Sequence, residues 1–128
     1  RALSGDAQGT LIHWDLSSGR ILHRMAGYLE RGKESNPLTS HYETIWGIAF
    51  HQDGQTALSV SRDQTAFLWD LNEGKFLRRY ALLKSGLFAV AFHPGGRSVL
   101  LGQLDGKMRV LDLESEQGLE FVGHTGRI

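Results

Sequence analysis

The feature that most constrains this 128-residue chain is an internal repeat of about 42 residues. Three stretches align without gaps: "ALSGDAQGTLIHWDLSSGRIL", "ALSVSRDQTAFLWDLNEGKFL" and "VLLGQLDGKMRVLDLESEQGL". In this alignment Trp14, Trp69 and Leu111 share one position, and the first interval is longer by an insertion of about 13 residues. A repeat of this length predicts a solenoid, a propeller or an array, in which each unit buries its apolar face against a neighbour.

Each unit has the character of β-structure. "TAFLWDL", "KMRVLDL", "IWGIAF" and "LFAVAF" are short runs of aliphatic, aromatic and β-branched residues. Turn-forming stretches such as "HQDG", "HPGG", "LDGK" and "SSG" separate them. We therefore expect four strands per unit, the outermost being the more polar "RILHRMA" or "KFLRRYAL", whose basic residues protect an exposed sheet edge.

Composition narrows the function classes. Hydrophobic residues make up 41% of the chain, which is enough for a core. The 14 basic and 14 acidic residues balance, so the charge does not favour a nucleic-acid partner, and no apolar run is long enough to predict contact with a membrane. Cysteine is absent, which excludes disulfides and thiolate metal sites and fits the cytoplasm, or the nucleus of a eukaryote. We expect no cofactor and no metal, because no metal-binding or phosphate-binding motif occurs.

The units resemble the blades of WD-repeat β-propellers. The resemblance rests on "WDL" twice, "LDL" once, "AFHQDG", "AFHPGG" and the pair Gly123 and His124. It covers nearly the whole chain apart from the insertion. It implies an all-β fold, a partial β-propeller built from four-stranded antiparallel blades.

The resemblance also implies boundaries. We expect a partial blade without its opening strand, an inserted loop, a complete blade, a complete blade with a degenerate polar network, and the start of a further blade; these are residues 1–26, 27–40, 41–82, 83–123 and 124–128. Because propellers close with about four to eight blades, the remaining blades should come from the same polypeptide or from another chain. The inserted loop is either solvated and inert or a contact for a partner.

In this family one polar network joins four side chains of a blade. By position these are His41, Ser59, Asp63 and Trp69 of the middle unit. The chemistry is coherent: the indole only donates, the hydroxyl and the neutral imidazole do both, and the carboxylate accepts. Because a half-made buried network is costly, its members should be present or absent together.

The other two units vary this network. In the third unit the four positions are Leu83, Leu101, Asp105 and Leu111, so three polar members have become leucine together. We expect the leucines to pack and Asp105 to cap its own turn.

The first unit keeps Ser4 and Trp14 but has Gln8 where the aspartate belongs, so the sequence does not predict a complete network there.

A Ser, a His and an Asp in one network also suggest a catalytic triad. We reject that interpretation and expect no enzyme, because the fourth member is a tryptophan, the hydroxyl sits within a strand, and no "GxSxG" elbow occurs. His51 and His93 occupy the same turn in two units, which indicates a role in the turn and not a metal site.

The family's usual docking surface is the narrow face near the central channel. By position, its residues here are Thr44, Trp46, Arg62, Phe88 and Leu104. Two aromatic residues with an arginine have the composition of an interaction hot spot. The alternative is that Trp46 and Phe88 simply pack between blades.

We therefore expect a non-catalytic scaffold that docks a protein or peptide on the propeller face. The alternative is a sensor or regulatory propeller domain of a larger multidomain protein, whose other parts could be catalytic or signalling. An active site within the propeller is a third interpretation, which the apolar central strands do not favour.

Overall fold

The computed structural model describes residues 1–25, 41, 43–81 and 85–122. In these ranges the chain forms strands and turns, and no helix. The strands are β1 (Ala2–Gly5), β2 (Leu11–Asp15), β3 (Arg20–Met25), β4 (Ile45–Phe50), β5 (Thr56–Ser61), β6 (Ala66–Asp70), β7 (Lys75–Tyr80), β8 (Leu87–Phe92), β9 (Ser98–Gln103), β10 (Lys107–Asp112) and β11 (Gly118–Val122).

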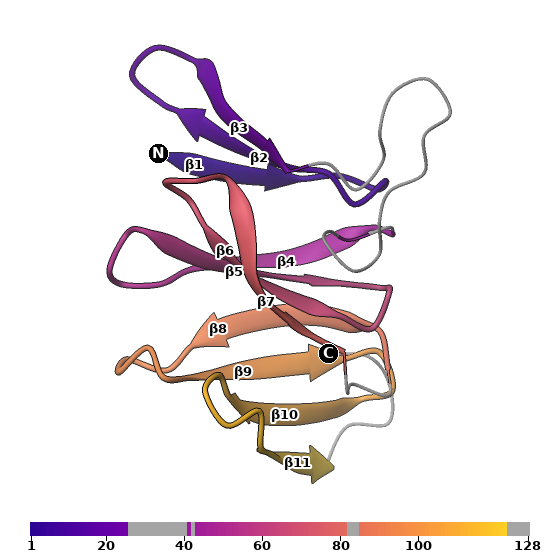
Figure 1. The fold of residues 1–128 in the computed structure, drawn as a ribbon. Helices are drawn as coiled ribbons and strands as arrows, with labels where there is room; N and C mark the ends of the chain where they lie inside the picture. The colour runs from indigo at the N-terminus through magenta and orange to yellow at the C-terminus, as the bar shows by residue number, and fades with distance from the viewer. Residues whose placement is uncertain (26–40, 42, 82–84, 123–128) are drawn as a thin grey trace.

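The strands form three antiparallel sheets that follow one another along the chain (Figure 1). The first sheet has the order β1-β2-β3, the middle sheet β4-β5-β6-β7 and the third sheet β8-β9-β10-β11. All pairs are sequential neighbours joined by short turns, as in a meander. The all-β prediction with four-stranded units is confirmed for the middle and third sheets. The expected inserted loop at 27–40 and the expected further blade at 124–128 lie outside the described residues.

The aspartate of each "WDL" or "LDL" triplet shapes the turn that follows it. Asp15, Asp70 and Asp112 each accept a hydrogen bond from the backbone N–H two residues later. Hydrogen bonds from the Ser17 and Ser18 hydroxyls hold the pKa of the Asp15 carboxyl below its usual range. An aspartate that bonds its own backbone in this way mimics a turn, which explains its recurrence.

The two turn histidines perform the predicted local role. His51 Nδ1 accepts a hydrogen bond from the backbone N–H of Asp53 at 3.0 Å. His93 Nδ1 accepts one from the backbone N–H of Gly95 at 3.3 Å.

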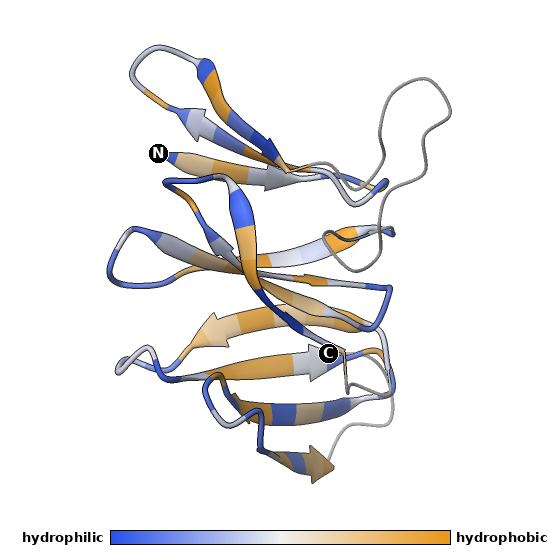
Figure 2. Cartoon of the chain, viewed as in Figure 1, coloured by the Kyte–Doolittle hydropathy of each residue, from blue (hydrophilic) through white to orange (hydrophobic). Residues whose placement is uncertain are grey.

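The hydrophobic cores lie between sheets. One core joins the first and middle sheets and contains Leu11, Met25, Ile45, Ala57, Phe67, Trp69 and Leu71. The other joins the middle and third sheets and contains Leu58, Val60, Ala66, Tyr80, Leu87, Val99, Leu101, Leu111 and Leu113. The middle sheet is therefore covered on both faces, which is why β5 is almost entirely buried although half of its residues are Ser or Thr (Figure 2). Each sheet depends on its neighbours for stability.

The register shifts at four strand pairs. In each case the pairing register skips one residue: Leu22 in β3, Trp46 in β4, Leu77 in β7 and Phe88 in β8. Such bulges turn a side chain away from the regular alternation of the strand. The shifts recur at equivalent places. Two are in the last strands of the first and middle sheets, β3 and β7, and two are in the first strands of the middle and third sheets, β4 and β8, which we call the innermost strands.

Candidate functional site

The four predicted network residues come together inside the middle sheet. Trp69 Nε1 donates to Ser59 Oγ at 2.7 Å, and Ser59 Oγ lies 2.6 Å from His41 Nε2. His41 Nδ1 lies 3.0 Å from Asp63 Oδ2. The strands explain the geometry: β5 carries the serine, the β5–β6 turn the aspartate and β6 the tryptophan, while His41 precedes β4.

The donors and acceptors of these three hydrogen bonds indicate where the protons of the network lie. The Ser59 oxygen accepts from the indole N–H of Trp69, and its hydroxyl proton is free to be donated to His41 Nε2. His41 Nδ1–H then donates to the Asp63 carboxylate. A neutral imidazole with its proton on Nδ1 satisfies every member.

The structure adds two residues to the network that the repeat alone did not identify. The backbone N–H of Thr65 donates to Asp63 Oδ1 at 2.9 Å, and its hydroxyl donates to the same oxygen. Ser61 Oγ accepts from the backbone N–H of Asp63 at 3.1 Å and donates to the carbonyl oxygen of Glu43. The signal for Thr65 was present in the sequence, because the first unit has a threonine at the same position.

The network is structural and not catalytic in its geometry. His41 and Ser59 are fully buried and Asp63 is nearly so. The ring of Phe67 packs edge-on against His41, with centroids 4.8 Å apart, and covers it. Since no substrate can reach the hydroxyl, the arrangement cannot act as a hydrolytic triad.

The third sheet replaces this network with packing. Leu101 and Leu111 are buried in the core between the middle and third sheets. Asp105 Oδ1 accepts from the backbone N–H of Lys107 at 3.1 Å, so it caps its turn as predicted. Leu83 lies outside the described residues.

In the first sheet a different aspartate takes over the turn. Trp14 Nε1 donates to Ser4 Oγ at 2.8 Å, as in the middle sheet. The carboxylate of Asp6, two residues before the expected position, accepts from the backbone N–H groups of Gln8 and Thr10. The glutamine at the aspartate position therefore does not leave this turn without a cap.

The aromatic residues of the predicted docking surface lie against each other. Trp46 and Phe88 have ring centroids 5.0 Å apart and are both half-buried. Each is the extra residue of a register shift in an innermost strand. The two rings therefore pack between neighbouring sheets and are also partly exposed to solvent.

The other three predicted residues adjoin strands of the same two sheets: Thr44 precedes β4, Arg62 follows β5 and Leu104 follows β9. The backbone N–H of Arg62 donates to the carbonyl oxygen of Thr44 at 3.1 Å, and the Thr44 hydroxyl donates to the carbonyl of Ala7. The backbone N–H of Leu104 donates to the carbonyl of Gly86 at 2.9 Å. A Cβ atom on Gly86 would meet both Leu104 and the Arg62 backbone. The structure thus brings Thr44, Arg62 and Leu104 to one edge, with Arg62 exposed; we call these three residues with Trp46 and Phe88 the rim patch.

Two stacked histidines occupy the contact between the first and middle sheets. His13 and His23 have Nδ1 atoms 3.4 Å apart and ring planes inclined by 11°. His13 is fully buried, and His23 lies where a Cβ atom on Gly74 would collide with it. Burial, with help from the nearby charges of Arg1 and His23, lowers the pKa of His13 below its ordinary value.

This pair predicts a pH-dependent stability. Because the folded protein holds His13 neutral, the unfolded chain binds the proton more readily, and protonation favours unfolding. The contribution is complete above about pH 6.5 and is lost as the pH falls below that value. His13→Leu, which installs the residue found at this position in the middle sheet, should flatten the profile of urea midpoint against pH. His93→Gln, at an exposed turn, should leave the slope unchanged, and equal slopes for wild type and His13→Leu would contradict the assignment.

Two further classes of site are absent from the described residues. Over these ranges no group of three or more His, Asp or Glu side chains could hold a metal ion. Within the same part of the chain no helix has the length and apolarity of a membrane span.

Comparisons with known proteins agree with this architecture. Residues 32–70 match the family model WD domain, G-beta repeat. The 77 kDa echinoderm microtubule-associated protein of Strongylocentrotus purpuratus is 33% identical over 66% of this chain and 12% of its own length. Autophagy-related protein 16 of Arabidopsis thaliana is 26% identical over 98% of this chain and 22% of its own length. The chain thus spans about a fifth or less of these relatives.

A solved structure gives the same result for the fold. The β-propeller domain of Cps50 (Swd1) from Myceliophteria thermophila superposes with a TM-score of 0.74 and 20% sequence identity, over 94% of this chain and 34% of that one. The stacked four-stranded sheets, the "WDL" turns and the matched repeat agree. The chain belongs to the WD-repeat β-propeller family.

Proposed function

We propose that this propeller segment is part of a non-catalytic scaffold that docks a protein or peptide on the rim patch. WD-repeat propellers are typically interaction scaffolds, and the observation that carries the specific proposal is the Trp46–Phe88 pair. Both rings come from register shifts in the innermost strands, so both leave the regular alternation of their strands. Beside them Arg62 is exposed and Leu104 half-exposed.

The scaffold supports this use physically. Each sheet is held by an apolar core on the side of its neighbour, so the ends of the central strands are fixed before a partner arrives. Preorganisation of this kind reduces the entropy that binding would cost. Aromatic and arginine side chains supply most of the energy at protein interfaces. The partner we propose is a protein or peptide, with neither membrane nor nucleic acid involved, in the cytoplasm or nucleus.

A second candidate is a sensor or regulatory propeller domain within a larger multidomain protein. The observation that favours it is the small share of each relative that the chain covers, 12% and 22% for the two described above. In either case further blades, from the same polypeptide or another chain, would complete the ring.

The double substitution Trp46→Ala and Phe88→Ala tests the rim patch. Because it removes both rings of the proposed hot spot, we expect partner recovery to fall by at least about tenfold. Quantitative mass spectrometry of proteins that co-purify with the complete protein measures this. The control is Phe50→Ala, an exposed aromatic at the other end of β4. If partner recovery persists in the double variant while its thermal unfolding remains cooperative, the patch is not the docking site.

A further inference from the structure

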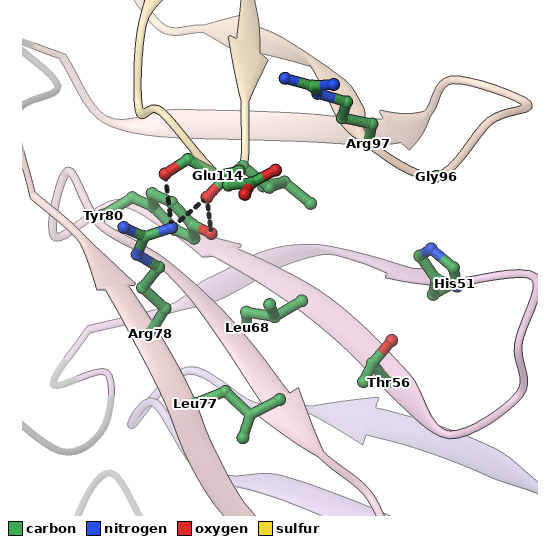
Figure 3. A pocket seen from close by; sticks show the side chains of 10 residues that line it. His51, Thr56, Leu68, Leu77, Arg78, Tyr80, Gly96, Arg97 and Glu114 are labelled. Atoms are coloured by element: carbon green, nitrogen blue, oxygen red, sulfur yellow. Dashed lines mark hydrogen bonds between the residues drawn. The ribbon is translucent and has the colours of Figure 1, made fainter.

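A groove of about 390 Å³ opens to solvent between the middle and third blades. We call it the inter-blade groove, and Figure 3 shows its lining. The volume falls within the range of about 300–1,000 Å³ that is typical of ligand sites. It is a second site, separate in its residues from the rim patch.

Leucines make the groove apolar. Leu113 is buried in the core between the two blades, and Leu68 packs against that core. Leu77 is the extra residue of the register shift in β7 and is 50% exposed. The shift therefore places an accessible leucine beside an apolar floor, where an aliphatic side chain would displace water from three surfaces.

Two polar residues of the groove are already committed to joining the blades. Arg78 donates from one terminal nitrogen to the carbonyl oxygens of Leu113 and Glu114, at 2.5 and 2.9 Å. The Tyr80 hydroxyl donates to the same Leu113 carbonyl at 2.8 Å (Figure 3). These bonds fix one wall of the groove. The other terminal nitrogen of Arg78 lies 3.8 Å from the Glu116 carboxylate, so both ends of the guanidinium face the third blade.

Arg97 forms an ion pair with Asp112 through Nε only, so its terminal amino groups remain available to a ligand. Its Nε donates to Asp112 Oδ2 at 3.1 Å, which orients the guanidinium. The side chain is 72% exposed, and its two terminal amino groups have no hydrogen bond to any residue that the structure describes. A guanidinium held at Nε with both amino groups free suits a carboxylate bound through two parallel bonds.

We propose that the inter-blade groove binds an extended segment of a partner protein in which an aliphatic residue adjoins an acidic one. The aliphatic side chain lies among Leu68, Leu77 and Leu113, and the carboxylate binds Arg97. Charge complementarity decides the chemistry, since Arg97 is the groove's one charged donor, among the described residues, that is not already held by the neighbouring blade. The exposed carboxylate of Glu114 on the same wall opposes a second acidic group, so it limits how many the segment carries.

A labelled peptide tests the chemistry of the occupant. The probe is a fluorescein-labelled hexapeptide with two central leucines flanked by glutamates, and anisotropy measures its binding to the complete protein. We expect binding to weaken about tenfold when alanines replace the leucines, and by a similar factor when lysines replace the glutamates. A higher salt concentration should weaken binding of the glutamate peptide, because salt screens its attraction to Arg97. Absence of binding, or equal binding of all three peptides, overturns the proposal.

Variants test the location. Leu77→Asp should weaken the glutamate peptide by about tenfold or more, whereas Leu22→Asp, at the equivalent exposed position of the first blade, should not change it. Arg97→Glu should weaken binding of the glutamate peptide and strengthen binding of the lysine peptide. Arg24→Glu is the control. Glu114→Gln should tighten the glutamate peptide a few-fold.

Two further readouts separate binding in the groove from loss of folding and from binding at the rim patch. Thermal unfolding of each variant tests whether the fold is retained. The Trp46→Ala and Phe88→Ala double variant should bind the glutamate peptide as wild type does, so the groove and the rim patch can fail independently. Equal affinity of Leu77→Asp and Leu22→Asp, or no change in peptide preference with Arg97→Glu, overturns the assignment of the site.

Discussion

Replacing His41 by alanine is expected to lower the free energy of unfolding by about 3 kcal/mol, because two buried partners lose their hydrogen bonds at once. The Ser59 hydroxyl loses the ring nitrogen at 2.6 Å, and the Asp63 carboxylate loses the donor at 3.0 Å. The ring of Phe67 also loses its edge-on contact. Urea unfolding monitored by tryptophan fluorescence measures the change.

A matched pair of serines provides the control for this prediction. Ser59 and Ser4 each accept a hydrogen bond from a tryptophan Nε1, at 2.7 and 2.8 Å, but Ser59 is buried and Ser4 is exposed. Ser59→Ala should cost about 2 kcal/mol, and Ser4→Ala less than about 0.5 kcal/mol, because water can replace the bond only at Ser4. Equal effects at the two serines would show that burial of the network does not set its energy. In the double variant His41→Ala and Ser59→Ala the costs should not add, since the two residues share one bond.

The second large effect is expected for Gly74→Ala, at about 3 kcal/mol of lost unfolding free energy. Gly74 has φ of +69°, a left-handed conformation that costs an alanine about 1–2 kcal/mol. A Cβ atom there would also lie 2.3–2.9 Å from His23, including its Cβ, which cannot swing away. The first and middle blades would have to separate locally.

Gly19 separates these two contributions. It occupies the equivalent turn of the first blade with φ of +71°, and nothing lies within 4 Å of its added Cβ. Gly19→Ala should therefore cost only the conformational term, about 1 kcal/mol. The difference between the two variants, measured by the same urea unfolding, reports the contact between blades. A difference near zero would mean that His23 does not hold the blades together.

Much of the site followed from the sequence because it depends on local repetition. The register of the three units was enough to identify His41, Ser59, Asp63 and Trp69 as equivalent to a known pattern. The exchange of three of these positions for leucine in the third unit pointed to packing, and Leu101 and Leu111 are indeed in the core. Such features depend on the order of residues within one unit.

The turn cap of the first sheet and the register shifts could not be predicted from the sequence of a single unit. Asp6 takes the turn-capping role two residues away from its expected position, because its carboxylate can reach the same backbone N–H groups. In the sequence Trp46 and Phe88 look like ordinary strand residues, and nothing marks the register shifts that skip them. A shift is a property of a strand pair, and the pair exists only after folding.

The sequence by itself determined the strands, their turns and the alternation of buried and exposed faces, because these depend on residues within about ten positions of each other. Only the tertiary structure decided what happens between blades. Arg78 reaches carbonyl oxygens 35 and 36 residues further along the chain, and Leu77 and Arg97 meet in one groove from different sheets. These contacts arise when sheets stack to bury their apolar faces, and stacking brings together residues whose separation in sequence carries no pattern.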